Sequence, residues 1–124
     1  MLKSFEVDSL PVRVYASRDD MSTAAAREAN DHLCGVISAQ GSAVAILATG
    51  NSQIQFLEKL LAISEVDWSK VTLFHMDEYL GLDADHSASF RRYMRERVES
   101  RVSPLIFHYL EGDALEPLRE CQRY

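Results

Sequence analysis

Residues 43–52 read Ala-Val-Ala-Ile-Leu-Ala-Thr-Gly-Asn-Ser, and they are the clearest indication of the fold class. Its first six residues are apolar without alternation, which predicts a strand that is covered on both faces. A turn at residues 49–52 follows at once. A helix is then predicted from about Gln53, because apolar residues recur at helical spacing at Ile54, Leu57, Leu60 and Leu61. A buried strand that leads through a tight turn into an amphipathic helix is typical of a parallel α/β unit.

The same order of elements repeats on both sides of this unit. Upstream, residues 12–15 predict a strand, and Ser17 with Asp20 predicts the start of a helix that ends at Gly41. Downstream, the predicted elements are a strand at 71–76, a helix capped by Ser87 or Ser89 and ended by Pro104, a strand at 105–110 and a helix at 113–124. This alternation predicts one α/β domain, a three-layer Rossmann-like parallel sheet with helices on both faces.

The composition is that of an ordinary globular domain, with 47% hydrophobic and 26% charged residues. The net charge of -6 argues against nucleic acid as a partner, because binding to its phosphate backbone needs clustered Lys and Arg. A small anion remains compatible, since a few backbone amides can hold a phosphate. Two cysteines without a CxxC pattern, no signal-peptide pattern and no long apolar run predict a cytoplasmic protein without membrane contact.

The turn Thr49-Gly50-Asn51-Ser52 is the first candidate binding site. In an open parallel sheet, ligands bind beyond the carboxyl ends of the strands. Gly50 lets the backbone approach a ligand, and the Thr49 and Ser52 hydroxyls add hydrogen bonds to phosphate oxygens. The same residues also fit an ordinary turn with Ser52 as a helix N-cap, so the turn alone leaves both interpretations open. It is neither GxGxxG nor a P-loop lysine motif, so nucleotide binding is not supported.

The second candidate site is Asp77-Glu78, at the end of the next apolar strand. Both carboxylates are expected to face the same crevice as the Thr49 turn. A half-buried carboxylate has a raised pKa and can act as a general base. Taken alone, the two residues also fit ordinary polar loop residues or a turn cap. Together with a phosphate-type turn on the neighbouring strand, however, they are interpreted as catalytic residues.

The other ionisable residues predict structural roles. His75 lies within a predicted strand and is expected to be hydrogen-bonded in the sheet, whereas His86 follows the acidic pair and is a further candidate to line the crevice. No pair of histidines has the spacing of a metal site, and adjacent Asp-Glu is a weak metal signal, so no metal is expected. Four arginines alternate with acids and are interpreted as a solvated helix face. They are Arg91, Arg92, Arg95 and Arg97.

Residues 47–52 (Leu-Ala-Thr-Gly-Asn-Ser) and 74–82 (Phe-His-Met-Asp-Glu-Tyr-Leu-Gly-Leu) together resemble the glucosamine-6-phosphate deaminase/isomerase family, which is related to the 6-phosphogluconolactonases. Residues 85–90 also resemble that family's segment after its acidic motif. The resemblance implies a domain that handles hexose 6-phosphates without a cofactor. It further implies that Asp77 is the base that moves a proton between C2 and C1 of the ring-opened amino sugar, before ammonia is lost to give fructose 6-phosphate. Residues 49–52 would bind the phosphate.

The sequence departs from the family at two points. The family's turn usually reads Thr-Gly-Gly or Thr-Gly-Ser followed by Thr-Pro, where this chain has Asn51, Ser52 and Gln53, which puts the exact substrate in doubt. The family's ring-opening histidine and phosphate-binding lysine belong to a second half that has no counterpart here. Residues 1–124 are therefore expected to be the N-terminal portion of a single truncated domain, inactive alone. The activity is assigned to the full-length protein.

Several expectations follow for the full-length protein and for the chain itself. The full-length protein is expected to be a homo-oligomer that binds a hexosamine phosphate. Half of a parallel sheet is expected to leave one strand edge and one apolar face unpaired, which favours partial disorder or self-association. Two alternative functions remain. One is hydrolysis of a 6-phosphosugar lactone, although Tyr79 stands where lactonases usually carry Arg. The other is a non-catalytic sugar-phosphate sensor, which would not require Asp77.

Overall fold

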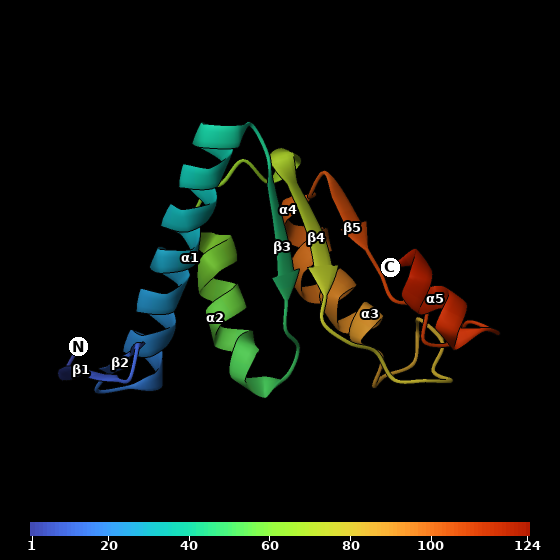
Figure 1. The fold of residues 1–124 in the computed structure, drawn as a ribbon, viewed down its shortest axis with the longest axis horizontal. Coiled ribbons are helices and arrows are strands. Elements are labelled where there is room, and N and C mark those ends of the chain that lie inside the picture. Colours follow the sequence, from blue (N-terminus) through green and yellow to red (C-terminus); the bar gives the residue numbers. More distant parts are fainter.

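The computed structural model describes residues 1–124 (Figure 1). A hairpin and a long helix come first, followed by three strands that alternate with helices. In chain order the elements are β1 (Lys3–Val7), β2 (Leu10–Val14), α1 (Arg18–Gln40), β3 (Ala43–Leu47), α2 (Asn51–Ala62), η1 (Trp68–Lys70), β4 (Val71–His75), α3 (Phe90–Met94), η2 (Arg95–Glu99), α4 (Ser100–Val102), β5 (Ile106–His108) and α5 (Pro117–Arg123). The segment α3–η2–α4 is one continuous helical stretch with a π-helical middle.

Strands β3, β4 and β5 form a parallel sheet with β4 in the centre. Figure 1 shows their three arrows side by side and pointing the same way. Leu47 pairs with His75, and Phe74 pairs with His108. All three strands therefore end at one edge of the sheet, which is where ligands bind in parallel α/β folds. The predicted α/β class and parallel sheet are confirmed.

The helix ends follow the sequence signals closely. The Ser17 hydroxyl accepts from the Asp20 amide at 3.0 Å, as predicted for the start of α1. Gly41 ends that helix in the left-handed conformation, with φ of 84°. Ser89 caps α3, and α4 ends just before Pro104. Helix α2 begins at Asn51, two residues earlier than predicted.

The core lies on one face of the sheet, against α2 and the α3–η2 stretch. Its largest buried side chains there are Leu57, Leu60, Val71, Leu73, Met94 and Val98. On the other face, Val44 is 69% exposed and Ile46 is 64% exposed. The predicted second layer of helices does not cover that face in this chain, because α1 packs against α2 rather than over the sheet. The expected uncovered apolar face is confirmed.

Two further predictions need correction. The predicted strand at 12–15 forms β2, but it pairs antiparallel with β1 in a separate hairpin and does not join the parallel sheet. The last helix begins at Pro117 instead of at residue 113, because proline occupies the first helical position readily. Leu118 of this helix is 83% exposed, so the helix does not bury that side chain against the sheet. None of the helices is long and apolar enough to cross a bilayer.

Candidate active site

The two predicted site segments follow neighbouring strands at the same edge of the sheet. The Met76 amide donates to the Leu47 carbonyl oxygen at 3.2 Å, which extends the β3–β4 ladder by one bond beyond the strands. Paired strands lie about 4.8 Å apart, so the chain enters the Thr49 turn and the Asp77 loop side by side. The structure thus confirms that both segments lie at the carboxyl edge.

The turn at residues 49–52 is built around Gly50. Its φ of 113° lies in a region that a side chain would strain, so glycine is required there. The Gly50 carbonyl oxygen accepts from the Gln53 amide and from the Tyr93 hydroxyl, each at 3.1 Å. The Asn51 and Ser52 amides donate no hydrogen bond within the chain and form the N-terminal end of α2. Free amides at a helix N-terminus favour an anion.

Asn51 and Ser52 line a hollow of about 200 Å³ together with Arg18 and Met21 of α1. Sequence reasoning did not identify Arg18 as a site residue. No sequence signal pointed to it, because only the packing of α1 against α2 brings residue 18 beside residues 51 and 52. The hollow is therefore lined by one cationic residue and by the two residues whose amides are unpaired.

Asp77 and Glu78 have different surroundings, although they are adjacent in sequence. Asp77 is exposed and lines a cleft of about 220 Å³ at the carboxyl edge of the sheet. The other lining residues come from the same loop and from the β5–α5 segment: Glu78, Leu80, Leu110, Glu111, Gly112, Pro117, Glu120 and Cys121. This cleft is distinct from the hollow beside Ser52. The single crevice predicted for the two segments is thus two separate depressions in this chain.

The Glu78 side chain is only 1% exposed and its oxygens are fully occupied. It accepts from the amides of Tyr79, Phe90 and Arg91 and from the Ser89 hydroxyl, at 2.8 to 3.0 Å. Burial by itself would raise the pKa of Glu78, but these hydrogen bonds outweigh it and hold that pKa below its ordinary value. Glu78 is therefore ionised. Although it lies in the loop after β4, its carboxylate accepts from the first two amides of α3.

Arg91 corrects the prediction of a solvated arginine face. Its side chain is 8% exposed, and its Nε lies 3.4 Å from a Glu78 oxygen. Its Nη2 donates to the Leu82 carbonyl oxygen at 2.7 Å and to Asp113 at 2.8 Å. The prediction failed because alternating charges along a helix do not reveal a buried carboxylate that comes from a distant loop.

Arg92 and Arg95 are less buried, and both contact the loop before α3. Arg92 pairs with Glu96 and donates to the Asp85 carbonyl oxygen at 3.1 Å. Arg95 pairs with the Asp85 carboxylate and donates to the Ala84 carbonyl oxygen, at 2.6 and 2.7 Å. The long loop between β4 and α3 is thus tied down by arginines of the helix that follows it.

His75 is a structural residue, as its strand position predicted. Its Nε2 accepts from the Leu110 amide at 2.9 Å, which places the proton of the neutral ring on Nδ1. Burial lowers the pKa of His75, and the Glu78 carboxylate offsets this only in part. His86 is exposed, and its Nδ1 accepts from the Ala88 amide. No three His, Cys, Asp or Glu side chains come together as a metal site.

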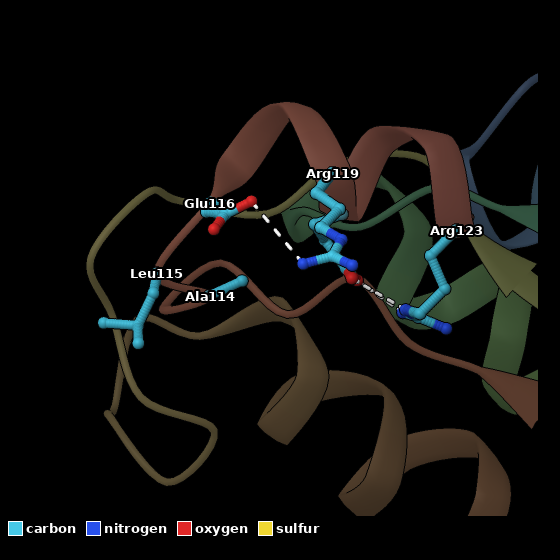
Figure 2. A pocket seen from close by; sticks show the side chains of 6 residues that line it. Ala114, Leu115, Glu116, Arg119 and Arg123 are labelled. Carbon is cyan, nitrogen blue, oxygen red and sulfur yellow. Dashed lines mark hydrogen bonds and ion pairs between the residues drawn. The ribbon is translucent and has the colours of Figure 1, made fainter.

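Figure 2 shows a third depression, which is formed along α5 by Ala114, Leu115, Glu116, Arg119, Glu120 and Arg123.

 The volume of this depression is about 440 Å³, and that of the hollow beside Ser52 is about 200 Å³. The dashed lines in Figure 2 join Glu116 to Arg119 and Glu120 to Arg123. The ion pair with Arg123 lowers the pKa of Glu120 to about 2. Since both arginines are already paired with carboxylates and no predicted site residue lies here, the depression is not part of the candidate active site.

The comparison with known protein families settles what kind of protein carries this site. A family model described as glucosamine-6-phosphate isomerases/6-phosphogluconolactonase matches residues 16–124. The chain belongs to this family. The match includes the Thr49 turn, the Asp77-Glu78 pair and the α5 segment, and it leaves out residues 1–15, which contain the N-terminal hairpin. The predicted family resemblance is confirmed.

Individual members of the glucosamine-6-phosphate isomerase/6-phosphogluconolactonase family match over part of their length. The glucosamine-6-phosphate deaminase of Aliivibrio fischeri (strain MJ11) is 37% identical over 83 residues, which are 63% of this chain and 31% of that protein. The deaminase of Cellvibrio japonicus (strain Ueda107) is 35% identical over 108 residues, which are 83% of this chain and 41% of that protein. The chain thus spans about a third to two fifths of these curated relatives.

Solved structures of the same family show the same fold. A monomeric glucosamine-6-phosphate deaminase superposes with a TM-score of 0.77 at 26% identity, over 87% of this chain and 45% of that one. A 6-phosphogluconolactonase from Shewanella baltica OS155 superposes with a TM-score of 0.72 at 23% identity, over 83% of this chain and 43% of that one. The likeness to the lactonase is evidence for the fold alone.

Proposed function

We propose that the full-length protein containing these residues is a glucosamine-6-phosphate deaminase/isomerase. The observation that carries the proposal is an exposed carboxylate, Asp77, at the end of the central strand of a chain that belongs to this enzyme family. The curated relatives described above are named as glucosamine-6-phosphate deaminases, which supports the deaminase over the lactonase branch. The reaction would convert glucosamine 6-phosphate and water into fructose 6-phosphate and ammonia.

Asp77 is proposed as the base of this reaction. Its carboxylate would take the proton from C2 of the ring-opened amino sugar and return it to C1, which turns the aldehyde into an alcohol and leaves an imine at C2. Water then adds to C2, and the carbinolamine that results loses ammonia. A base at a strand end is suitable for this step, because the strand fixes its distance to the reacting carbon.

Glu78 is proposed to support Asp77 rather than to transfer a proton itself. The sequence placed both carboxylates in the catalytic pair, but the two Glu78 oxygens already accept hydrogen bonds from three amides and a hydroxyl. An ionised carboxylate with these partners has no free lone pair directed at a substrate. Its proposed contribution is to hold the loop from which the Asp77 side chain extends.

The phosphate group is proposed to bind at Thr49, Gly50, Asn51 and Ser52. The unpaired amides of Asn51 and Ser52 support this assignment, as does the Arg18 side chain that lines the same hollow. The hollow and the Asp77 cleft are separate, so the substrate would have to extend along the sheet edge from one to the other. No cofactor is part of the proposal.

Ammonia release from glucosamine 6-phosphate by the complete gene product tests the proposal. We expect the wild type to release ammonia and to form fructose 6-phosphate. Asp77→Asn should lower kcat by roughly 100-fold or more, because general base catalysis contributes about that much. Asp31→Asn, an exposed aspartate of α1, is the matched control and should leave kcat unchanged.

Two results would reject the deaminase assignment. One is the absence of ammonia, and the other is an unchanged kcat in Asp77→Asn. Consumption of a 6-phosphogluconolactone instead would establish the lactonase alternative. Binding of a sugar phosphate without turnover of either substrate would establish the sensor alternative.

A further inference from the structure

We propose that Arg91 is a positioning residue that holds Asp77 at the cleft by fixing Glu78 and the loops around it. The inference rests on the proposed function, because Asp77 matters as a base only if that function is correct. Arg91 itself does not line the cleft. Its effect would therefore be exerted through the residues it contacts.

Arg91 joins α3 to two other segments, the loop after β4 and the segment after β5. Its Nε lies 3.4 Å from Glu78, in the loop after β4. Its Nη2 contacts the Leu82 carbonyl oxygen at 2.7 Å, further along that loop, and Asp113 at 2.8 Å, in the segment after β5. A planar guanidinium suits this arrangement, because its donors point in several fixed directions at once. A lysine ammonium is too compact to reach all three acceptors with the same geometry.

The contacts around Glu78 extend this arrangement to Asp77. The Gly81 amide donates to the Gly112 carbonyl oxygen at 2.7 Å. Gly112 packs so closely that a Cβ built on it would lie 2.2 Å from the Tyr79 carbonyl oxygen and 2.8 Å from the Glu78 Cγ. The residue that follows Asp77 is thus enclosed between α3 and the segment after β5. This enclosure limits where the exposed Asp77 carboxylate can lie.

The charge of Arg91 is needed because Glu78 is buried and ionised. The two side chains are 8% and 1% exposed, so removal of the guanidinium would leave a buried carboxylate without its counter-charge. Asp113, which is 43% exposed, is the second carboxylate on the same guanidinium. Arg101 is exposed at the end of the same helical stretch and makes no ion pair with Glu78 or with the loop after β4. Arg101 is therefore the matched control.

Amide hydrogen exchange, followed by NMR in the 124-residue chain, tests the positioning role without any substrate. In Arg91→Met, we expect the Tyr79, Gly81 and Phe90 amides to exchange at least about tenfold faster, because each depends on the loop that Arg91 holds. The Leu73 amide in the parallel sheet should change by less than about twofold. Arg91→Lys should give intermediate rates, and Arg101→Met should give wild-type rates.

Two exchange results would overturn the proposal. Equal acceleration at all amides would mean that Arg91 stabilises only the whole fold. Unchanged exchange at the Tyr79 and Phe90 amides would mean that it does not hold the loop. If Arg91→Met does not fold, Asp113→Asn tests the same role, because it removes the negative charge of one partner of the guanidinium while keeping the side-chain shape. Its expected result is faster exchange at the same loop amides.

Turnover by the complete gene product gives the second readout. A displaced base lowers the rate of the chemical step more than it weakens substrate binding. We therefore expect Arg91→Met to lower kcat by roughly tenfold or more while KM changes by less than about threefold. Equal values of kcat in Arg91→Met and wild type would overturn the link to Asp77. If the wild type itself is inactive, the proposed function fails, and the exchange experiment still decides whether Arg91 holds the loop.

Discussion

The Tyr124 hydroxyl donates to the His75 carbonyl oxygen at 2.6 Å and accepts from the His75 amide at 2.8 Å. The pairing of β5 with β4 ends at Phe74 and His108, so the phenol satisfies a strand amide that lies just beyond this pairing. One side chain thereby joins the C-terminal segment to the strand that leads into the Asp77 loop.

Loss of this contact should destabilise the fold measurably. Tyr124→Phe removes both hydrogen bonds and leaves the His75 amide unpaired, so the free energy of unfolding should fall by about 1–3 kcal/mol. Urea denaturation followed by circular dichroism measures it. Tyr79→Phe is the control, because that ring is exposed and should change stability by less than about 0.5 kcal/mol. Equal stabilities of the two variants would contradict the structural role of the Tyr124 hydroxyl.

The stability contributed by Glu78 should depend on pH. Its pKa is lowered in the folded state, so its contribution is present above the unfolded-state pKa of about 4.5 and is lost as the pH falls through the folded-state pKa. Glu78→Gln should therefore be less stable than wild type at pH 7, by about 1–3 kcal/mol, and the difference should shrink in acid. Urea unfolding of both proteins at several pH values tests this.

The comparison isolates Glu78 because the other strongly perturbed carboxylate is the same in both proteins. The pKa of Glu120 is lowered to about 2 by its ion pair with Arg123, so its contribution cancels in the difference. A stability difference that stays constant from neutral to acidic pH would show that the Glu78 charge does not stabilise the loop.

Glycine at position 112 should not be replaceable by alanine. The added Cβ would meet the Tyr79 carbonyl oxygen, which is backbone and cannot move freely, so Gly112→Ala should cost about 1–3 kcal/mol of stability. Gly35→Ala is the matched control. Nothing lies within 4 Å of its Cβ, and alanine within α1 should stabilise by about 0.5–1 kcal/mol. Thermal denaturation should shift in opposite directions for the two variants, and shifts in the same direction would refute the close approach at Gly112.

Alanine at position 50 should weaken both the turn and phosphate binding. The φ of 113° strains any residue with a Cβ, so Gly50→Ala should lose about 1–3 kcal/mol of stability. We also expect weaker binding of glucosamine 6-phosphate by isothermal titration calorimetry. Asn51→Ala is the control, because it keeps the backbone amides in place. Weaker binding in Asn51→Ala than in Gly50→Ala would mean that the side chain, not the turn, holds the phosphate.

The uncovered face of the sheet should promote self-association of the 124-residue chain. Val44 and Ile46 of β3 are exposed on this face, as is Ile106 of β5 on the far side of β4, and exposed apolar side chains of this kind favour association in water. Ile46→Lys should shift sedimentation toward the monomer. Leu118→Lys, on the exposed side of α5, is the control. Equal sedimentation of Ile46→Lys and wild type would show that this face is not the one that associates.

The α/β class, the parallel strands and the two segments at their carboxyl edge could all be predicted from the amino-acid sequence. Each depends on local chemistry that can be identified along the chain: apolar runs for strands, Ser17 and Gly41 for the ends of α1, and glycine at the turn after β3. It also identified the family, because residues 74–82 are specific to it. These features are encoded by neighbouring residues.

The roles of the charged residues depend on tertiary contacts. Asp77 and Glu78 cannot be distinguished from the sequence, because they are adjacent carboxylates. The packing of α3 and of the segment after β5 buries Glu78 and leaves Asp77 exposed. The buried Arg91 and the Arg18 that lines the hollow beside Ser52 likewise depend on contacts between distant segments. Burial and charge pairing are properties of such long-range contacts, and the order of residues along a single chain does not specify them.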